Sequence, residues 1–164
     1  MTAFGVFLTA LGNAAERDGV LGDECVEYPP SEEVDYWATP LNAVVFGWMG
    51  VDGVHYALLK VDGEIRDSSP VIQIGPMDFD EPYSLLAPTF VDYLAIGCGV
   101  ARSEIEGLIA LEESGRSALL DFMRANFQQS RFCADDVERD LGRYATMIVQ
   151  KPEIVQKADD EPVA

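Results

Sequence analysis

The side chains best suited to nucleophilic or acid–base chemistry are one histidine and three cysteines. His55 lies in an apolar segment next to a turn, whereas Cys25, Cys98 and Cys133 are widely spaced and form no Cys-x-x-Cys pair. A dyad of His55 with Cys98 or Cys133 would activate a thiolate, but no motif supports one. A histidine within a strand is more typical of a hydrogen-bonded structural residue. We therefore predict that the protein is not an enzyme, with a small hydrolase using Cys98 or His55 as a remote alternative.

Motifs for cofactors and metals are also missing from the sequence. It contains no Gly-x-Ser-x-Gly, P-loop, Gly-x-Gly-x-x-Gly or His-Glu-x-x-His motif. Asp78, Asp80 and Glu81 lie in a loop bounded by Pro76 and Pro82, but this loop has neither the glycine nor the twelve-residue spacing of an EF-hand. We interpret these aspartates as turn-forming residues at the edge of a sheet, and we predict no metal and no cofactor.

Charge is the most unusual property of the composition. The chain has 11 Lys and Arg against 29 Asp and Glu, a net charge of −18. No Lys or Arg occurs between Arg17 and Lys60 or between Arg66 and Arg102. Such a surface repels phosphate backbones and attracts basic proteins, so we expect a basic protein partner and no direct binding to nucleic acid. The alternative is that the acidity serves only solubility.

Two acidic segments contain the candidate partner-binding residues. Residues 18–42 look irregular, with Pro29-Pro30 followed by carboxylates and aromatic rings, and residues 76–82 form the proline-bounded loop. Carboxylates would steer association and aromatic rings would anchor a partner, although such rings more often lie on the core. The candidates are Glu27, Glu32, Glu33, Asp35, Tyr36, Trp37, Trp48, Asp78, Asp80 and Glu81.

The fold is organised around residues 43–82, which predict a meander of three or four antiparallel strands. Apolar runs at 44–49, 54–59 and 71–74 are separated by Gly-Val-Asp-Gly, in which Gly50 and Gly53 tolerate positive φ, and by Asp62-Gly63. Alternation puts Trp48 on one face with residues 44 and 46. Because neither face of the sheet is cleanly polar, we expect helices to cover both.

Helical spacing of apolar residues predicts helices at 3–15, from 87–89 to about 97, at 103–113, at 117–127 and at 135–148. The chain is thus predicted to be a single α+β domain over residues 1–151, with a polar, disordered tail at 152–164. The odd, scattered cysteines favour a reducing compartment, and residues 3–11 are too short to span a bilayer. We therefore expect a cytoplasmic protein with no membrane contact.

The central block resembles the SUKH superfamily, the cell-wall-assembly-regulator-like domains best known as immunity proteins of bacterial toxin systems. Residues 44–59 supply the apolar strands and the turn, Pro76-Met77-Asp78-Phe79 the following loop, and residues 86–99 the next helix. These segments lie within residues 44–99, about a third of the chain. The chain departs from the family pattern at two places. Pro29-Pro30 stand where a Leu-Pro pair is usual, and the turn reads Gly-Val-Asp-Gly where Gly-Gly-Asp-Gly is commoner.

The resemblance implies an α+β fold with a mainly antiparallel sheet and no shared catalytic residues. It also implies a function, namely binding a cognate toxin and masking its active site. Our leading hypothesis is a cytoplasmic immunity-type protein whose toxin is basic. The alternative is a regulatory or scaffold domain that binds a host protein.

Overall fold

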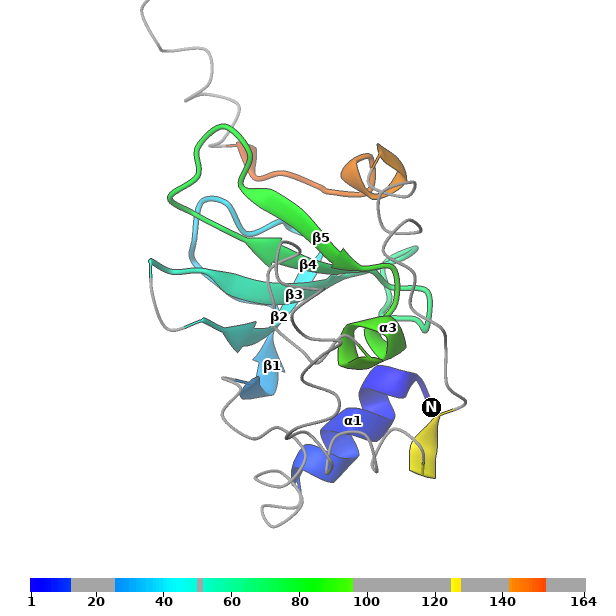
Figure 1. Cartoon of the computed structure of the whole chain (residues 1–164). Helices are drawn as coiled ribbons and strands as arrows, with labels where there is room; N and C mark the ends of the chain where they lie inside the picture. Colours follow the sequence, from blue (N-terminus) through cyan, green and yellow to red (C-terminus); the bar gives the residue numbers. More distant parts are fainter. Residues whose placement is uncertain (13–25, 50–51, 96–124, 128–141, 153–164) are drawn as a thin grey trace, which may run out of the picture.

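A five-stranded antiparallel sheet forms the centre of the molecule, with strands in the order β1-β2-β3-β4-β5 (Figure 1). The computed structural model describes residues 1–12, 26–49, 52–95, 125–127 and 142–152. The elements are α1 (Ala3–Gly12), β1 (Val26–Ser31), β2 (Ala43–Trp48), β3 (His55–Leu59), β4 (Val71–Ile74), β5 (Tyr83–Ala87) and α3 (Phe90–Ala95). The mixed α+β fold and the antiparallel meander are confirmed, and the sheet gains a strand at each end.

Both predicted turns contain an Asp-Gly pair in the left-handed region. Asp52 and Gly53 have φ of 52° and 70°, and Asp62 and Gly63 have φ of 51° and 82°. Positive φ at both central residues is the type I′ pattern, which matches the twist of the flanking strands. The expectation for Gly53 is confirmed, but Asp52 itself also adopts positive φ, and Gly50 lies outside the described residues.

Strand β1 corrects the prediction that residues 18–42 are irregular. It pairs with β2 through Val26 opposite Gly47 and Ser31 opposite Val45, with a register shift between them. Pro29 and Pro30 cannot donate ladder hydrogen bonds, and β1 is at the edge of the sheet, where proline is tolerated. Because proline is rare within strands, the sequence pattern does not indicate a strand here.

A bulge in β2 changes which side chains share a face. Val45 pairs with Ala57 but Gly47 pairs with Tyr56, so Phe46 is an extra residue between them. The bulge reverses the alternation after Phe46, and Trp48 packs against the opposite face. The prediction that Trp48 shares a face with residues 44 and 46 is therefore wrong.

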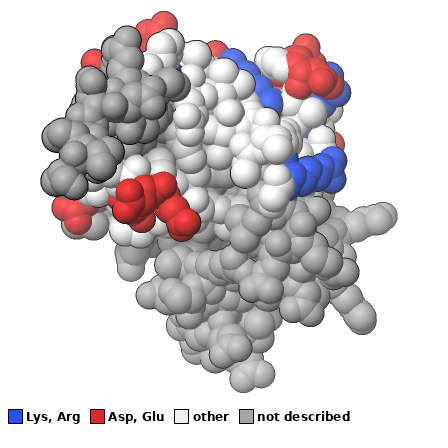
Figure 2. Space-filling model, turned by 90° about the horizontal axis from the view of Figure 1, so that it is seen from above, with Lys and Arg blue, Asp and Glu red and all other residues white. Residues whose placement is uncertain are grey.

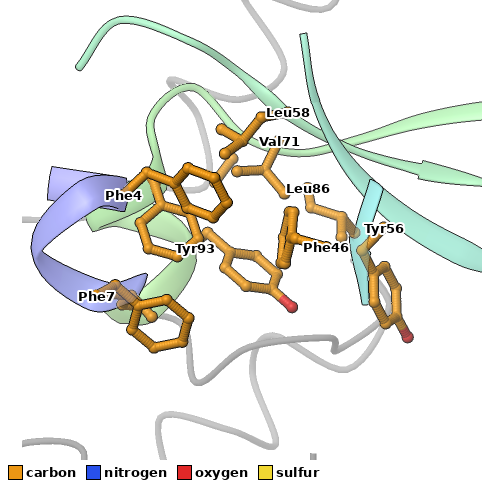
Figure 3. Packing of buried hydrophobic residues seen from close by; sticks show 11 residues of the cluster. Phe4, Phe7, Phe46, Tyr56, Leu58, Val71, Leu86 and Tyr93 are labelled. Atoms are coloured by element: carbon orange, nitrogen blue, oxygen red, sulfur yellow. The ribbon is translucent and has the colours of Figure 1, made fainter. Parts of the chain in front are cut away.

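Helices α1 and α3 cover one face of the sheet, side by side (Figure 1). Their aromatic rings meet at Phe90, whose ring centroid is 4.9 Å from that of Phe4, 5.0 Å from Phe7 and 5.6 Å from Phe46, all edge to face. Figure 3 shows this cluster between the helices and the strands. The aromatic core fixes both helices on the sheet.

On the opposite face, the described chain that packs on the sheet is irregular at 34–42 and helical at 142–145. Ala38 and Tyr144 are buried against Val45, Ala57 and other strand residues, with Met147 and Ile148 packed around them. Residues 142–145 are helical, but a turn at 146–147 follows, so the predicted helix does not continue to residue 148. This segment lies on the far side of the sheet from α1 and α3 (Figure 1).

Strand β5 and the start of α3 correct two further predictions. Tyr83–Ala87 pairs with β4, although this segment was not predicted as a strand. Helix α3 begins at Phe90, with Thr89 as its N-cap: the Thr89 Oγ1 atom accepts a hydrogen bond from the Asp92 amide at 3.1 Å. Pro88 therefore precedes the cap instead of occupying the first turn, and Ala87 belongs to the strand.

Several predictions fall outside the described residues. They are the helices at 103–113 and most of those at 117–127 and 135–148, the tail beyond residue 152, and the three cysteines. The predicted face of α3 is confirmed, because Phe90, Tyr93 and Leu94 are all buried.

Candidate functional site

The two predicted acidic segments lie side by side at one end of the sheet. The indole Nε1 of Trp37 donates a hydrogen bond to the Pro76 carbonyl oxygen at 3.1 Å. The Trp37 ring also stacks on Phe79, with centroids 5.5 Å apart and planes 10° apart. Trp37 thus joins residues 32–42 to the loop at 75–82, about forty positions further along the chain.

Internal hydrogen bonds give the loop at 75–82 a defined shape. The Gly75 amide donates to the Pro82 carbonyl oxygen at 2.8 Å, and the Asp78 amide donates to the Gly75 carbonyl oxygen at 3.0 Å. The Glu81 amide donates to Asp78 Oδ1 at 3.4 Å. The interpretation of Asp78 as a turn-forming residue at the sheet edge is confirmed. The loop is preorganised, so a partner binding to it orders little chain.

Large apolar side chains on this loop face solvent. Met77 is 67% exposed and Phe79 is 65% exposed, although Phe79 stacks on Trp37. Single exposed apolar residues are common, but two on one preorganised loop bordered by carboxylates form a candidate contact surface. We call Trp37, Met77, Phe79 and the loop carboxylates Asp78, Asp80 and Glu81 the loop surface.

Tyr36 and Trp48 lie over His55 at the same end of the sheet. The Tyr36 ring centroid is 5.8 Å from that of Trp48 and 5.5 Å from the His55 imidazole, and Trp48 is 4.9 Å from His55. Tyr36 remains 37% exposed. Tyr36 also approaches Gly53, where an added Cβ would lie within about 3 Å of the tyrosine ring. The absence of a side chain at residue 53 therefore leaves room for the ring. The rings lie on the core, as the alternative interpretation held, but Tyr36 keeps an accessible edge.

His55 is buried and hydrogen-bonded, as predicted. It is 0% exposed, and its Nδ1 lies 2.7 Å from the Gly53 carbonyl oxygen, which accepts only. Nδ1 therefore carries the proton, and Nε2 accepts from the Thr39 hydroxyl at 2.9 Å. Burial lowers the pKa of His55, as does the Lys151 charge to a smaller extent, while the bond to Gly53 partly opposes them.

The candidate carboxylates differ in their surroundings. Glu32 forms an ion pair with Lys60 at 2.7 Å, so it is partly neutralised. The side chain of Glu27 lies outside the described residues, and the other exposed candidate carboxylates are Glu33, Asp35, Asp78, Asp80 and Glu81. On the face drawn in Figure 2, acidic side chains form separate groups, with a broad uncharged surface between them. The acidic charge on this face is thus confined to separate groups of side chains.

An open hollow of about 390 Å³ lies beside the loop at 75–82, and sequence reasoning missed it. Its lining includes Asp52 and Val54 from the β2–β3 turn region, Gln73 from β4, and Met77 and Glu81 from the loop. Sequence alone offered one signal, since Asp-Gly turns and proline-bounded loops both mark sheet ends.

The described residues hold no group of three His, Cys, Asp or Glu side chains arranged to bind a metal ion. Cys98 and Cys133, the predicted partners of a His55 dyad, lie outside those residues. None of the described helices is both long and apolar enough to cross a bilayer.

Comparisons of the chain with protein-family models, with curated proteins and with solved structures return no match.

Proposed function

We propose that the protein is a cytoplasmic immunity-type binding protein that neutralises a basic toxin domain by covering its active site. The loop surface would contact the toxin through Met77 and Phe79, with the surrounding carboxylates steering the encounter. It acts by binding, with no catalysis and no cofactor.

The observation that carries the proposal is the loop surface itself. Trp37 holds the loop through the bond to Pro76 and the stack on Phe79, so two exposed apolar side chains are presented among carboxylates. Aromatic anchors surrounded by charge are typical of protein-binding sites, and a preorganised loop loses little entropy on binding. Burial of Met77 and Phe79 by a partner would contribute about 1.5–3 kcal/mol each as an upper range.

Charge supports a basic partner. The net charge is −18, and no Lys or Arg occurs between Arg66 and Arg102, the stretch that contains the loop. Complementary charge raises association rates and excludes acidic partners. An acidic protein can block a basic nuclease by occupying the surface that binds its polyanionic substrate.

The resemblance to the SUKH superfamily gives the proposal its biological class. The strand, Asp52-Gly53 turn, strand, Pro76-Met77 loop and α3 follow one another in the order of the resemblance. An edge strand, β1, occupies the region of Pro29-Pro30, where the chain departs from the family pattern.

The direct test is coexpression with the product of the adjacent gene, scored by pull-down and by rescue of growth if that product is toxic. We expect tight, salt-sensitive binding and rescue. Rescue without complex formation, or neither, would refute the proposal. Binding of a host protein without rescue would favour the regulatory or scaffold alternative.

A matched pair of charge reversals tests the role of the loop surface in steering. Asp80→Lys changes the charge on the loop, and Glu64→Lys makes the same change at the opposite end of the sheet, in the Asp62-Gly63 turn. Both residues are exposed. We expect Asp80→Lys to slow association at low salt by about tenfold and Glu64→Lys to have a much smaller effect. Equal association rates for the two variants would show that steering is not local to the loop.

A further inference from the structure

The hollow beside the loop at 75–82 carries negative charge that the described residues do not neutralise. Asp52, Asp78 and Glu81 all line it, and all three are exposed. The two ion pairs in the described part of the chain, Lys60–Glu32 and Arg66–Asp62, involve none of these carboxylates. Three like charges around one hollow repel one another, and a cation entering it would relieve that repulsion.

The rest of the hollow is suited to an apolar stem. Val54, Met77 and Pro82 contribute apolar surface between the carboxylates. Lysine and arginine side chains combine a long aliphatic stem with a charged head, and they bury the stem along apolar surface. A bare metal ion would gain nothing from these apolar walls, whereas a basic side chain uses both parts of the lining.

Gln73 supplies an unused acceptor. It lines the hollow, and its Oε1 is buried with no hydrogen-bond partner among the described residues. A buried acceptor without a partner is unfavourable, and the terminal torsion of glutamine turns over a broad range. Rotation of the amide would present Oε1 to a donor in the hollow, such as an N–H of a guanidinium group.

We propose that the hollow is a socket for one arginine or lysine side chain of a basic protein, with Met77 and Phe79 as apolar contacts at its edge. That this protein is a toxin rests on the proposed function. The chemistry of the socket is independent of it, because it follows from the lining of the hollow. The carboxylates would hold the charged head, and Val54, Met77 and Pro82 the stem.

A hexa-arginine peptide tests the socket without any toxin. We expect titration of the peptide into ¹⁵N-labelled protein to shift the NMR signals of the Gln73 side-chain amide and the Gly75 backbone amide most strongly.

A pair of arginine substitutions tests the same binding. Ser84 is exposed and lines the hollow, so Ser84→Arg places a guanidinium inside it. Ser68→Arg, at an exposed turn elsewhere, adds the same charge as a control. We expect Ser84→Arg to weaken binding by about tenfold relative to Ser68→Arg. Equal affinities, or shifts centred elsewhere, would overturn the inference.

Neutralised variants test the socket in the toxin complex. Asp52→Asn, Asp78→Asn and Glu81→Gln together remove three charges. Asparagine tolerates the positive φ of residue 52 and keeps the acceptor at residue 78. The control, Asp62→Asn with Glu64→Gln and Asp67→Asn, removes three exposed charges that lie outside the hollow and are not candidates for partner binding.

The two triple variants should differ in dissociation rate. Charge pairs that become enclosed in the complex act mainly on dissociation, whereas charges that stay exposed in the complex act on association. We expect the socket variant to dissociate about tenfold or more faster than the wild type, and the control to stay within about twofold. Equal dissociation rates would overturn the socket. Failure of the wild type to bind or rescue, with the peptide result intact, would refute the toxin proposal and leave the socket standing.

Discussion

The buried His55 predicts a specific loss of stability in mild acid. In the folded protein its Nδ1–H donates to the Gly53 carbonyl oxygen and its Nε2 accepts from Thr39. Protonation adds a charge to a fully buried ring and makes Nε2 a donor, so the Thr39 hydroxyl loses its acceptor. The folded state therefore favours the neutral ring, and the pKa of His55 is lowered mainly by burial.

The sign of the pH dependence follows from proton uptake. The pKa of a histidine in an unfolded chain is 6.5, and the pKa of His55 in the folded protein is lower. Between these two values the unfolded state binds more protons, so the free energy of unfolding falls as the pH falls. The contribution of His55 is fully present above pH 6.5 and decreases below it by at most about 1.4 kcal/mol per pH unit. The decrease stops once the pH is below the folded pKa.

Urea unfolding at pH 7.5, 6.5 and 5.5 measures the effect. The carboxylates also begin to titrate toward the acid end, so the wild type is compared with His55→Asn at each pH. Asparagine can still donate an amide N–H toward Gly53 but does not titrate. We expect the stability difference between wild type and variant to shrink as the pH falls from 6.5 to 5.5. An NMR titration of the His55 imidazole should give a midpoint below 6.5.

Parallel stability curves for wild type and His55→Asn would refute this reasoning. They would mean that the folded and unfolded states bind protons at His55 equally, despite the burial of the ring. An imidazole midpoint at or above 6.5 would refute it independently, because it would place the stabilising interaction on the charged form.

Two further variants test local contacts. Trp37→Phe keeps a ring over Phe79 but removes the N–H that donates to Pro76, so we expect urea unfolding to show a loss of about 1 kcal/mol, and a larger loss for Trp37→Ala; equal losses in the two variants would contradict this division. Thr89→Ala removes the N-cap of α3 and should lower the free energy of unfolding by about 1 kcal/mol, while Thr89→Ser should retain most of it; an unchanged midpoint in Thr89→Ala would show that the bond to the Asp92 amide contributes little.

Local chemistry made the centre of the sheet predictable. The Asp62-Gly63 turn needs positive φ at two successive residues, and few residue pairs tolerate it, so the sequence indicates the hairpin directly. The apolar runs on either side then define β3 and β4. Helix α1 is similarly local, because Phe4 and Phe7 recur at helical spacing and both become buried.

The missed elements depend on partners distant in sequence. Strand β1 contains two prolines, and only its edge position beside β2 makes a strand there acceptable. Trp48 changes face because Phe46 is an extra residue opposite β3, and alternation within β2 contains no sign of the bulge. The fold class could thus be predicted from the sequence. The number of strands and the face on which each side chain lies depend on how the strands pair.

The candidate site was predictable in composition but not in geometry. Carboxylates and aromatic rings mark residues 27–37 and 78–81 as unusual, and the structure brings parts of both segments together. The contact itself joins Trp37 to Phe79 across most of the sheet's sequence, and no local pattern specifies it. The sequence indicates residue 52 only as part of the Gly-Val-Asp-Gly turn, yet that turn places Asp52 in the lining of the hollow.

The acidity of the loop has two physical consequences that composition alone could not separate. Exposed Met77 and Phe79 would promote association between copies of the protein, and the neighbouring Asp78, Asp80 and Glu81 oppose this by mutual repulsion. The same three charges attract a basic partner toward the same apolar side chains. Solubility and recognition are therefore not competing explanations of the charge. If the proposal is right, Asp80→Lys will both slow association with the toxin and increase self-association, whereas Glu64→Lys, which changes the net charge equally, will do neither to the same extent.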